Sequence, residues 1–300
     1  MTTPSEKRQF TPIDVDSWEQ FEETLKELQN KRIQHKNLTA MQVSPFLYRG
    51  QGDASWPLFT TLERELQAID NVTFSQYYRL IARIKPQIES FTGTHWNVRE
   101  YPQYEKWAKE KDITLMLLEL EKSGNVDEYR YMTYLRHHGF PSPLLDWTRS
   151  PYVAAYFSFA AISKTPIDQR PERVSIYVYW ESPKGFRVHN HAFGNPYIHT
   201  FGPYVRTHQR HFLQQSQYTI CIAYSEDQDE WRYTQHEEAF FRADEDQDVL
   251  FHYTIPSTEW RKVIRLIDAY NLNAYSLFGS EESLMQTLAL RELHLSEKGL

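Results

Sequence analysis

The segment 144–162 constrains the fold of this chain more than any other. Its first part alternates between apolar and polar side chains between two prolines, which predicts a short strand with one apolar face. Leu145 and Trp147 would lie on that apolar face. The opposite face would carry three polar side chains: Asp146, Thr148 and Ser150. Because Ser150 suits the N-cap of a helix and Pro151 suits its first turn, a mostly buried helix should begin there.

Alternation of the same kind predicts further strands, and helical spacing of apolar residues predicts helices around them. The expected strands cover residues 44–52, 174–180, 217–223 and 249–255. The expected helices cover residues 17–32, 74–91, 105–121, 127–138, 257–271 and 280–293. Since helices come mostly early and late, the fold class is α+β, with a central, mostly antiparallel sheet flanked by helices. We expect one domain over residues 1–300, with residues 1–40 as an N-terminal helical extension.

The composition disfavours several classes of protein. The single cysteine, Cys221, excludes a disulfide framework and a cysteine-rich zinc module, and it is more simply a packing residue than a thiol nucleophile. The longest purely aliphatic stretch, residues 115–118, is far shorter than the ~20 apolar residues of a membrane helix. The polar N-terminus carries no secretory signal. We therefore expect a cytoplasmic protein without membrane contact. No P-loop, dinucleotide-binding glycine motif or nucleophile-elbow motif occurs.

The negative charge of the chain is concentrated in one segment. Residues 224–248 hold ten acidic and two basic residues, whereas the whole chain has a net charge of −7. The remainder is therefore close to neutral, which disfavours general binding of nucleic acid through a basic surface. The acidic segment itself could be a partner surface, a lid or a solvated face, and the last is the commonest role of charge runs.

Two features of the sequence could bind an anion. Arg49 ends an apolar strand and is followed by Gly50, where a ligand can approach the backbone closely, and a guanidinium binds phosphate through two N–H groups. The polar residues of segment 146–150 point toward the start of the next helix, whose N–H groups favour anions. The alternatives are that Arg49 pairs with Asp146 as a structural ion pair, and that Asp146 and Thr148 satisfy backbone groups around the two prolines.

The histidines form no metal-binding motif. Five lie between residues 189 and 211: His189, His191, His199, His208 and His211. No HExxH helix is present and no cysteine accompanies them, so we interpret them as surface or packing residues and expect no metal. Of the pair His137 and His138, we retain His138 as a candidate site residue because Gly139 follows it and the polar strand lies nearby.

The chain resembles the FRG domain family through four blocks that occur in order between about residues 15 and 293. The first block is Tyr48-Arg49-Gly50-Gln51, with Trp56-Pro57-Leu58 and Leu62-Glu63-Arg64 after it. The most characteristic block is residues 137–148, in which Pro143 stands where the family commonly has arginine. The third contains Arg210, Gln214, Ser216 and Tyr218, with Ser216 in place of the usual glycine. The fourth is formed by residues 255–256 and 276–278.

A more distant resemblance concerns ADP-ribosyltransferases of the toxin type, which also begin with a strand ending in aromatic-Arg-Gly. It implies an ADP-ribosyltransferase-like fold and NAD as substrate, with Arg49 on an NAD phosphate or ribose and Thr148 and Ser150 at the nicotinamide end. The catalytic residues implied in this way are Arg49, Asp146, Thr148 and Gln214. The implied cofactor-binding residues are Tyr48, Gly50, Gln51, His138, Ser150 and Arg210.

The chain departs from that enzyme pattern where a later strand should supply a glutamate. Residues 214–217 read Gln-Gln-Ser-Gln there, and a glutamine can hydrogen-bond a ribose hydroxyl but supplies no negative charge. Glu237 and Glu238 are alternatives for that charge, although the acidic segment that contains them should be solvated. Asp146 is a further alternative.

Two functional hypotheses follow from these residues. The first is an NAD-dependent ADP-ribosyltransferase that acts on a protein or nucleic acid, as a toxin or phage-defence effector with a neutralising partner. The second is a binding module that holds a nucleotide or a partner without turning it over. The absent strand glutamate favours the second, whereas an arginine beside a polar strand suits a small anionic ligand in both. We prefer the enzyme, and a purely structural role ranks last because it leaves the polar set unexplained.

Overall fold

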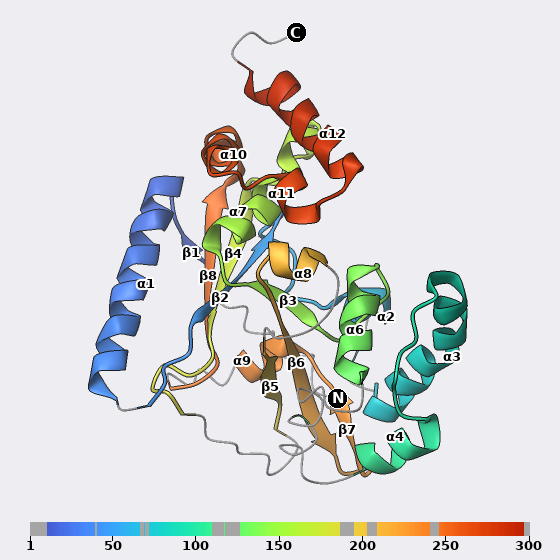
Figure 1. Cartoon of the computed structure of the whole chain (residues 1–300). Helices are drawn as coiled ribbons and strands as arrows, with labels where there is room; N and C mark the ends of the chain where they lie inside the picture. The colour runs from blue at the N-terminus through green and yellow to red at the C-terminus, as the bar shows by residue number, and fades with distance from the viewer. Residues whose placement is uncertain are drawn as a thin grey trace, which may run out of the picture.

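The computed structural model describes residues 11–39, 41–66, 69, 72–109, 117, 127–186, 195–202, 209–240 and 246–296. In these ranges the chain forms a mixed α/β fold around an eight-stranded sheet (Figure 1). The strands are β1 (Ile13–Asp14), β2 (Phe46–Gln51), β3 (Leu145–Thr148), β4 (Arg173–Trp180), β5 (Tyr197–Phe201), β6 (Ser216–Ser225), β7 (Glu230–Tyr233) and β8 (Val249–Pro256). Their order is β1-β8-β4-β2-β3-β6-β5, with β7 also paired to β6. Only the β1–β8 pair is parallel, so the expectation of a mostly antiparallel sheet is confirmed.

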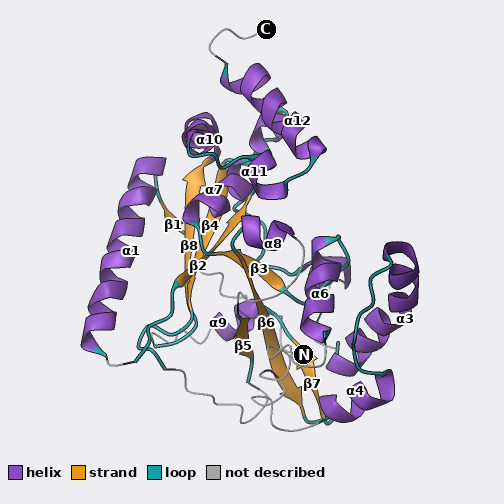
Figure 2. Cartoon of the chain, viewed as in Figure 1, coloured by secondary structure: helices purple, strands orange, loops and turns teal. Residues whose placement is uncertain are grey.

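The sheet is nearly divided at its centre. Strand β2 shares six register pairs with β4 but a single pair, Tyr48 with Thr148, with β3. Strands β2 and β3 therefore diverge on leaving this contact. One half-sheet consists of β1, β8, β4 and β2, and the other of β3, β6, β5 and β7 (Figure 2).

Helices cover both half-sheets. They are α1 (Trp18–Leu38), α2 (Thr61–Leu66), α3 (Phe74–Thr92), α4 (Tyr101–Ala108), α6 (Glu128–His137), α7 (Pro151–Phe159), α8 (Gln209–Leu213), α9 (His236–Phe240), α10 (Trp260–Ala269), α11 (Ala274–Phe278) and α12 (Glu281–Leu290). None of these described helices combines the length and the apolar composition needed to cross a bilayer.

Three hydrophobic cores hold the layers together. The first lies between the β1-β8-β4-β2 half-sheet and helices α1, α7 and α10. The second packs α3, α4 and α6 against β5, β6 and β7. The third joins the two half-sheets, because it combines side chains of β2 and β4 with side chains of β3, β5 and β6. Leu145 and Trp147 both belong to this third core, as the alternation of their strand predicts.

Most of the expected elements are confirmed close to their expected bounds, and one helix differs. Helix α7 begins after Ser150, whose Oγ accepts a hydrogen bond from the Val153 N–H at 3.3 Å. The helix expected over residues 105–121 is described as α4, which begins earlier because Pro102 occupies its first turn. Apart from Leu117, residues 110–126 of that region lie outside the described ranges.

Two buried histidines make the stability of the fold sensitive to acid. Burial lowers the pKa of His252 to about 4, and burial together with the charge of Arg49 lowers the pKa of His236 to about 3. Both values lie below the ~6.5 of an unfolded histidine, so between about pH 4 and 6.5 the unfolded chain binds more protons. The free energy of unfolding should therefore decrease as the pH falls through this window.

The His252→Gln variant should show a weaker pH dependence than the parent. Removing one such group lowers the slope by up to about 1.4 kcal/mol per pH unit, which corresponds to one proton. Urea titrations between pH 4.5 and 7.5 measure this slope. Equal slopes for parent and variant would contradict the assignment of His252, whose Nε2 lies 2.7 Å from the Ser175 Oγ.

Candidate functional site

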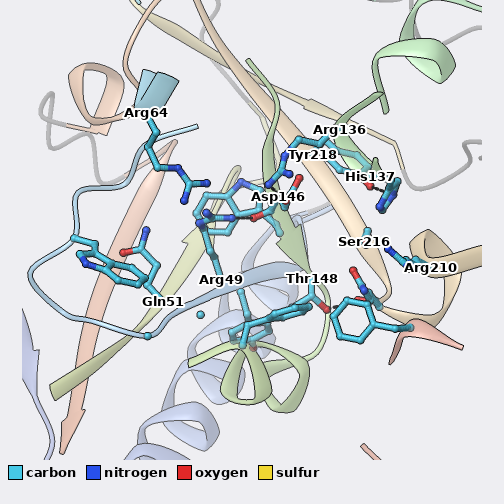
Figure 3. Close-up of a pocket in the computed structure, with 18 residues that line it drawn as sticks. Arg49, Gln51, Arg64, Arg136, His137, Asp146, Thr148, Arg210, Ser216 and Tyr218 are labelled. Atoms are coloured by element: carbon cyan, nitrogen blue, oxygen red, sulfur yellow. Dashed lines mark hydrogen bonds and ion pairs between the residues drawn. The ribbon is translucent and has the colours of Figure 1, made fainter. Parts of the chain in front are cut away.

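A cavity of about 370 Å³ opens where β2 and β3 diverge (Figure 3). Its walls combine both half-sheets with residues of α2, α6, α7, α8 and α11. Four arginines and one aspartate are its charged lining residues: Arg49, Arg64, Arg136, Arg210 and Asp146. The cavity is therefore strongly cationic although the chain as a whole is acidic.

Close packing of Gly50 on α7 fixes the direction of Arg49. A Cβ at Gly50 would lie 1.9 Å from the Ala154 carbonyl oxygen, so only glycine lets β2 approach the helix this closely. Successive side chains of a strand point to opposite faces, and Arg49 therefore points away from α7 and into the cavity. There its Nη1 donates to the backbone carbonyl of Asp146 at 2.8 Å.

The side chain of Arg49 is partly buried and only partly hydrogen-bonded. Its Nε is out of contact with solvent and has no hydrogen-bond partner among the residues that the structure describes. Burial lowers the pKa of Arg49 to about 10; Asp146 opposes this shift, and the positive charges of Arg136 and Arg64 add to it. Arg49 still carries its charge at neutral pH, which leaves a buried donor that an anion could satisfy.

Asp146 is held by a different arginine from the one that the sequence suggested. Its carboxylate Oδ2 accepts a hydrogen bond from Arg136 Nη2, whereas Arg49 reaches only its backbone carbonyl. The second carboxylate oxygen, Oδ1, is buried without a hydrogen-bond partner. The ion-pair alternative considered for Arg49 is therefore replaced by an Arg136–Asp146 pair that forms one wall of the cavity.

The hydroxyl groups of Thr148 and Ser150 are both engaged with the backbone. Thr148 Oγ1 donates to the Gln214 carbonyl at 2.7 Å and accepts from the Ser150 N–H at 3.2 Å. Thr148 lines the cavity, but Ser150 does not, because its side chain caps α7. The backbone-satisfying role considered for Asp146 and Thr148 is therefore confirmed for Thr148, whereas the Asp146 carboxylate pairs with Arg136, and Ser150 is the N-cap that the sequence predicts.

Gln214 and Arg210 bring α8 to the opposite wall of the cavity. Gln214 Nε2 donates to the Leu277 carbonyl at 3.2 Å, which ties α8 to α11. The Arg210 guanidinium lies 5.5 Å from the centre of the Phe278 ring, within the range of a cation–π contact. Both side chains line the cavity, as do Tyr48, Gly50 and Gln51 of β2.

His137, rather than His138, reaches the cavity. His137 Nε2 lies 2.6 Å from the hydroxyl of Tyr218, which is also 3.3 Å from His211 Nδ1. His138 stacks on Tyr134 and lines a separate, shallow hollow that α3 borders. His189, His191 and His208 lie outside the described residues. Among the residues that are described, no three His, Cys, Asp or Glu side chains come close enough together to hold a metal ion.

The other residues considered for chemistry lie away from the cavity. Glu237 Oε1 accepts from the Leu58 N–H at 3.1 Å, and Glu238 Oε2 accepts from the Thr234 hydroxyl at 2.9 Å. Cys221 is buried in the third core. None of these three is a lining residue of the cavity.

Sequence reasoning gave no role to two cavity arginines. Arg136 lies in the last turn of α6, directly before His137 and the candidate site residue His138. Arg64 lies on α2, within the Leu62-Glu63-Arg64 block. Three aromatic lining residues were also assigned no role in the site: Trp56, Phe157 and Phe278. In the sequence, the feature that could have indicated Arg136 is its position at the end of the predicted helix that precedes the polar strand.

The fold and site define a mixed α/β protein with an arginine-lined cavity between two half-sheets. Residues 44–166 match the family model of the FRG domain. The match contains β2, α2, α6, β3 and α7, and with them Arg49, Arg136 and Asp146. No curated protein and no solved structure matches the chain.

Proposed function

We propose that the cavity binds a nucleotide through its phosphate groups, with NAD as the substrate, and that the chain transfers ADP-ribose from NAD to a protein or nucleic-acid acceptor. The observation that carries the proposal is Arg49, a partly buried arginine whose buried Nε lacks a partner among the described residues while Arg64 and Arg136 lie nearby. Buried cations are costly unless an anion accompanies them. A pyrophosphate supplies such an anion and several acceptor oxygens.

The remaining lining of the cavity suits the other parts of a dinucleotide. Trp56, Phe157 and Phe278 offer aromatic surfaces on which flat rings can stack. Gln51 donates through Nε2 to the Pro57 carbonyl at 3.2 Å, and its Oε1 is buried without a partner. That oxygen could accept a hydrogen bond from a ribose hydroxyl or from the carboxamide of nicotinamide.

The proposed reaction breaks the bond between the nicotinamide nitrogen and the ribose carbon. Nicotinamide leaves with the bonding electron pair, and the acceptor forms a new bond to the same carbon as it loses a proton. Positive charge develops on the ribose in the transition state, and a carboxylate nearby stabilises it. Asp146 is the only carboxylate among the described lining residues, so it is our candidate for this role.

Binding without turnover is the second candidate function, and one observation favours it. The Asp146 carboxylate is already paired with Arg136. A paired carboxylate offers less stabilisation to a developing cation than one that faces the substrate alone. In this case the cavity would hold a nucleotide as a ligand.

The Asp146→Asn variant separates the two candidates. Removing the negative charge should tighten nucleotide binding by about 3- to 10-fold in either case, since one repulsion is lost. If Asp146 stabilises the transition state, the transfer rate should fall about 100-fold, as it does when electrostatic stabilisers are removed. The matched control is Asp268→Asn, which breaks an ion pair with Arg291 outside the cavity. Unchanged transfer in Asp146→Asn would contradict its catalytic role.

The proposal itself is tested by incubating the purified protein with NAD labelled in its adenylate and with a cell lysate. Labelled macromolecules together with released nicotinamide are expected for the transferase. Nicotinamide release without labelled acceptor would indicate hydrolysis of NAD. If neither occurs and NAD gives no thermal stabilisation, the proposal is wrong. An active enzyme of this kind would consume NAD in the cytoplasm, as expected of a toxin or phage-defence effector that a neutralising partner restrains.

A further inference from the structure

We infer that the nucleotide carries a further phosphate group besides its pyrophosphate, and that Arg64 binds this group. The inference rests on the proposed function, because it refines the ligand of the same cavity. It comes from the charges and pairings of the four lining arginines.

The cavity holds more positive charge than NAD can neutralise. The four arginines and one aspartate of the lining have a net charge of +3 when His137 is not counted. In NAD the two negative charges of the pyrophosphate are partly cancelled by the positive nicotinamide ring. Two positive charges of the cavity would then remain without a counter-charge, in a site that is partly removed from water. A phosphomonoester adds about −1.5 to −2 at neutral pH, which comes close to cancelling this excess.

Arg64 is the arginine that best fits the additional phosphate. Arg136 is paired with the carboxylate of Asp146, and Arg49 is fixed to the backbone carbonyl of the same residue. Arg64 forms no ion pair or side-chain hydrogen bond with any residue that the structure describes. Its side chain nevertheless reaches from α2 into the cavity toward Arg49 (Figure 3), and its charge lowers the pKa of Arg49.

Arg64 is exposed to solvent, and the contacts of α2 hold it near Arg49. The helix is fixed by Glu63, whose Oε2 accepts from the Thr60 N–H at 2.5 Å, and by the Thr60 Oγ1, which accepts from the Glu63 N–H at 3.2 Å. The Leu62 N–H also donates to the Ser142 carbonyl at 3.2 Å, which ties α2 to the chain that leads into β3. Arg64 is therefore held at the cavity by a capped and anchored helix.

Two kinds of nucleotide carry the required group. A phosphate on the ribose of a dinucleotide, as in NADP, and the third phosphate of a nucleoside triphosphate share the same chemistry. Pairs of ligands that differ by one phosphate distinguish these sources. NAD is compared with NADP, and ADP is compared with ATP.

Calorimetric titration of the full chain with these four compounds tests the inference. We expect the ligand with the additional phosphate to bind at least about 10-fold more tightly in one pair, since a hydrogen bond to a charged group contributes about 1.5–3 kcal/mol. Arg64→Gln should reduce that ratio to within about threefold and leave the affinity for the shorter ligand nearly unchanged. Arg83→Gln is the matched control, because Arg83 is also exposed on a helix without a described partner, but away from the cavity.

Each outcome of this titration decides the inference. A ratio near one in both pairs overturns it while NAD binding, and with it the proposed function, stands. If Arg64→Gln lowers the affinity equally for ligands with and without the additional phosphate, the inference is also overturned, because Arg64 would then bind the pyrophosphate. If no nucleotide binds the parent protein, the proposed function fails together with the inference. A ratio that depends on Arg64 in the NAD and NADP pair supports the inference together with the transferase. A ratio that depends on Arg64 only in the ADP and ATP pair supports the phosphate site but contradicts the transferase, because ATP has no nicotinamide to release.

Discussion

Replacing Arg49 by alanine is expected to weaken NAD binding at least about 100-fold and to abolish the transfer of label. The guanidinium is partly buried, with its Nε removed from solvent, and a charge-assisted hydrogen bond to phosphate contributes about 1.5–3 kcal/mol. A phosphate that spans two of its N–H groups would lose both contacts, which corresponds to about two factors of ten or more in affinity. Calorimetry with NAD and the transfer assay measure the two effects.

Two companion variants make the Arg49 result interpretable. Arg49→Lys keeps the charge but loses the planar pair of donors, so it should recover part of the affinity and little of the transfer. Arg261→Ala removes an exposed arginine of α10 outside the cavity and should change neither. The thermal midpoint of each variant shows whether it is folded. A folded Arg49→Ala protein that binds NAD like the parent would contradict the phosphate site.

Replacing Gly50 by alanine should destabilise the fold by about 3 kcal/mol or more. The new Cβ would lie 1.9 Å from the Ala154 carbonyl oxygen and 2.5 Å from the Ser158 Oγ, so α7 and β2 would have to separate. Forcing extra atoms into a packed interface typically costs about 1–3 kcal/mol, and the clash here involves backbone. Urea denaturation of the parent and the variant measures the loss.

Gly52→Ala is the matched control for this clash. A Cβ at Gly52 meets nothing closer than the Ser158 carbonyl oxygen at 3.7 Å, which is an ordinary contact. This variant should stay within about 1 kcal/mol of the parent. Similar stabilities for the two alanine variants would show that the contact between β2 and α7 relaxes easily. They would also remove the reason given for the direction of Arg49.

The elements that the sequence predicted well are those with a strong local pattern. Strands β4, β6 and β8 are eight or more residues long, and strand β3 is followed by Ser150 and Pro151, which suit the N-cap and first turn of a helix. Strands β1, β5 and β7 were missed. Strand β7 pairs with the adjacent β6 in a local hairpin, with Ser225 opposite Glu230, but its four residues within the acidic segment give too little alternation to be recognised.

The candidate site was predicted in part for the same reason. Arg49 and Asp146 are each recognisable from their own strand, and the structure brings both to one cavity. The partner of the Asp146 carboxylate lies on α6, which no local pattern places beside β3. For this reason the sequence suggested Arg49 as the partner of the Asp146 carboxylate, whereas the structure pairs that carboxylate with Arg136. Spacing along the chain could not distinguish two arginines that reach the same residue from different elements.

The single register pair between β2 and β3 also bears on what the FRG match describes. The matched residues 44–166 supply these two strands, one from each half-sheet, but neither of the strands that flank them, β4 and β6. Cut out at those limits, the segment would leave unpaired backbone on both outer sides and would lose most of the third core. The matched segment therefore supplies one wall of the cavity but cannot complete its own sheet, so in this chain the cavity depends on strands that lie outside the match.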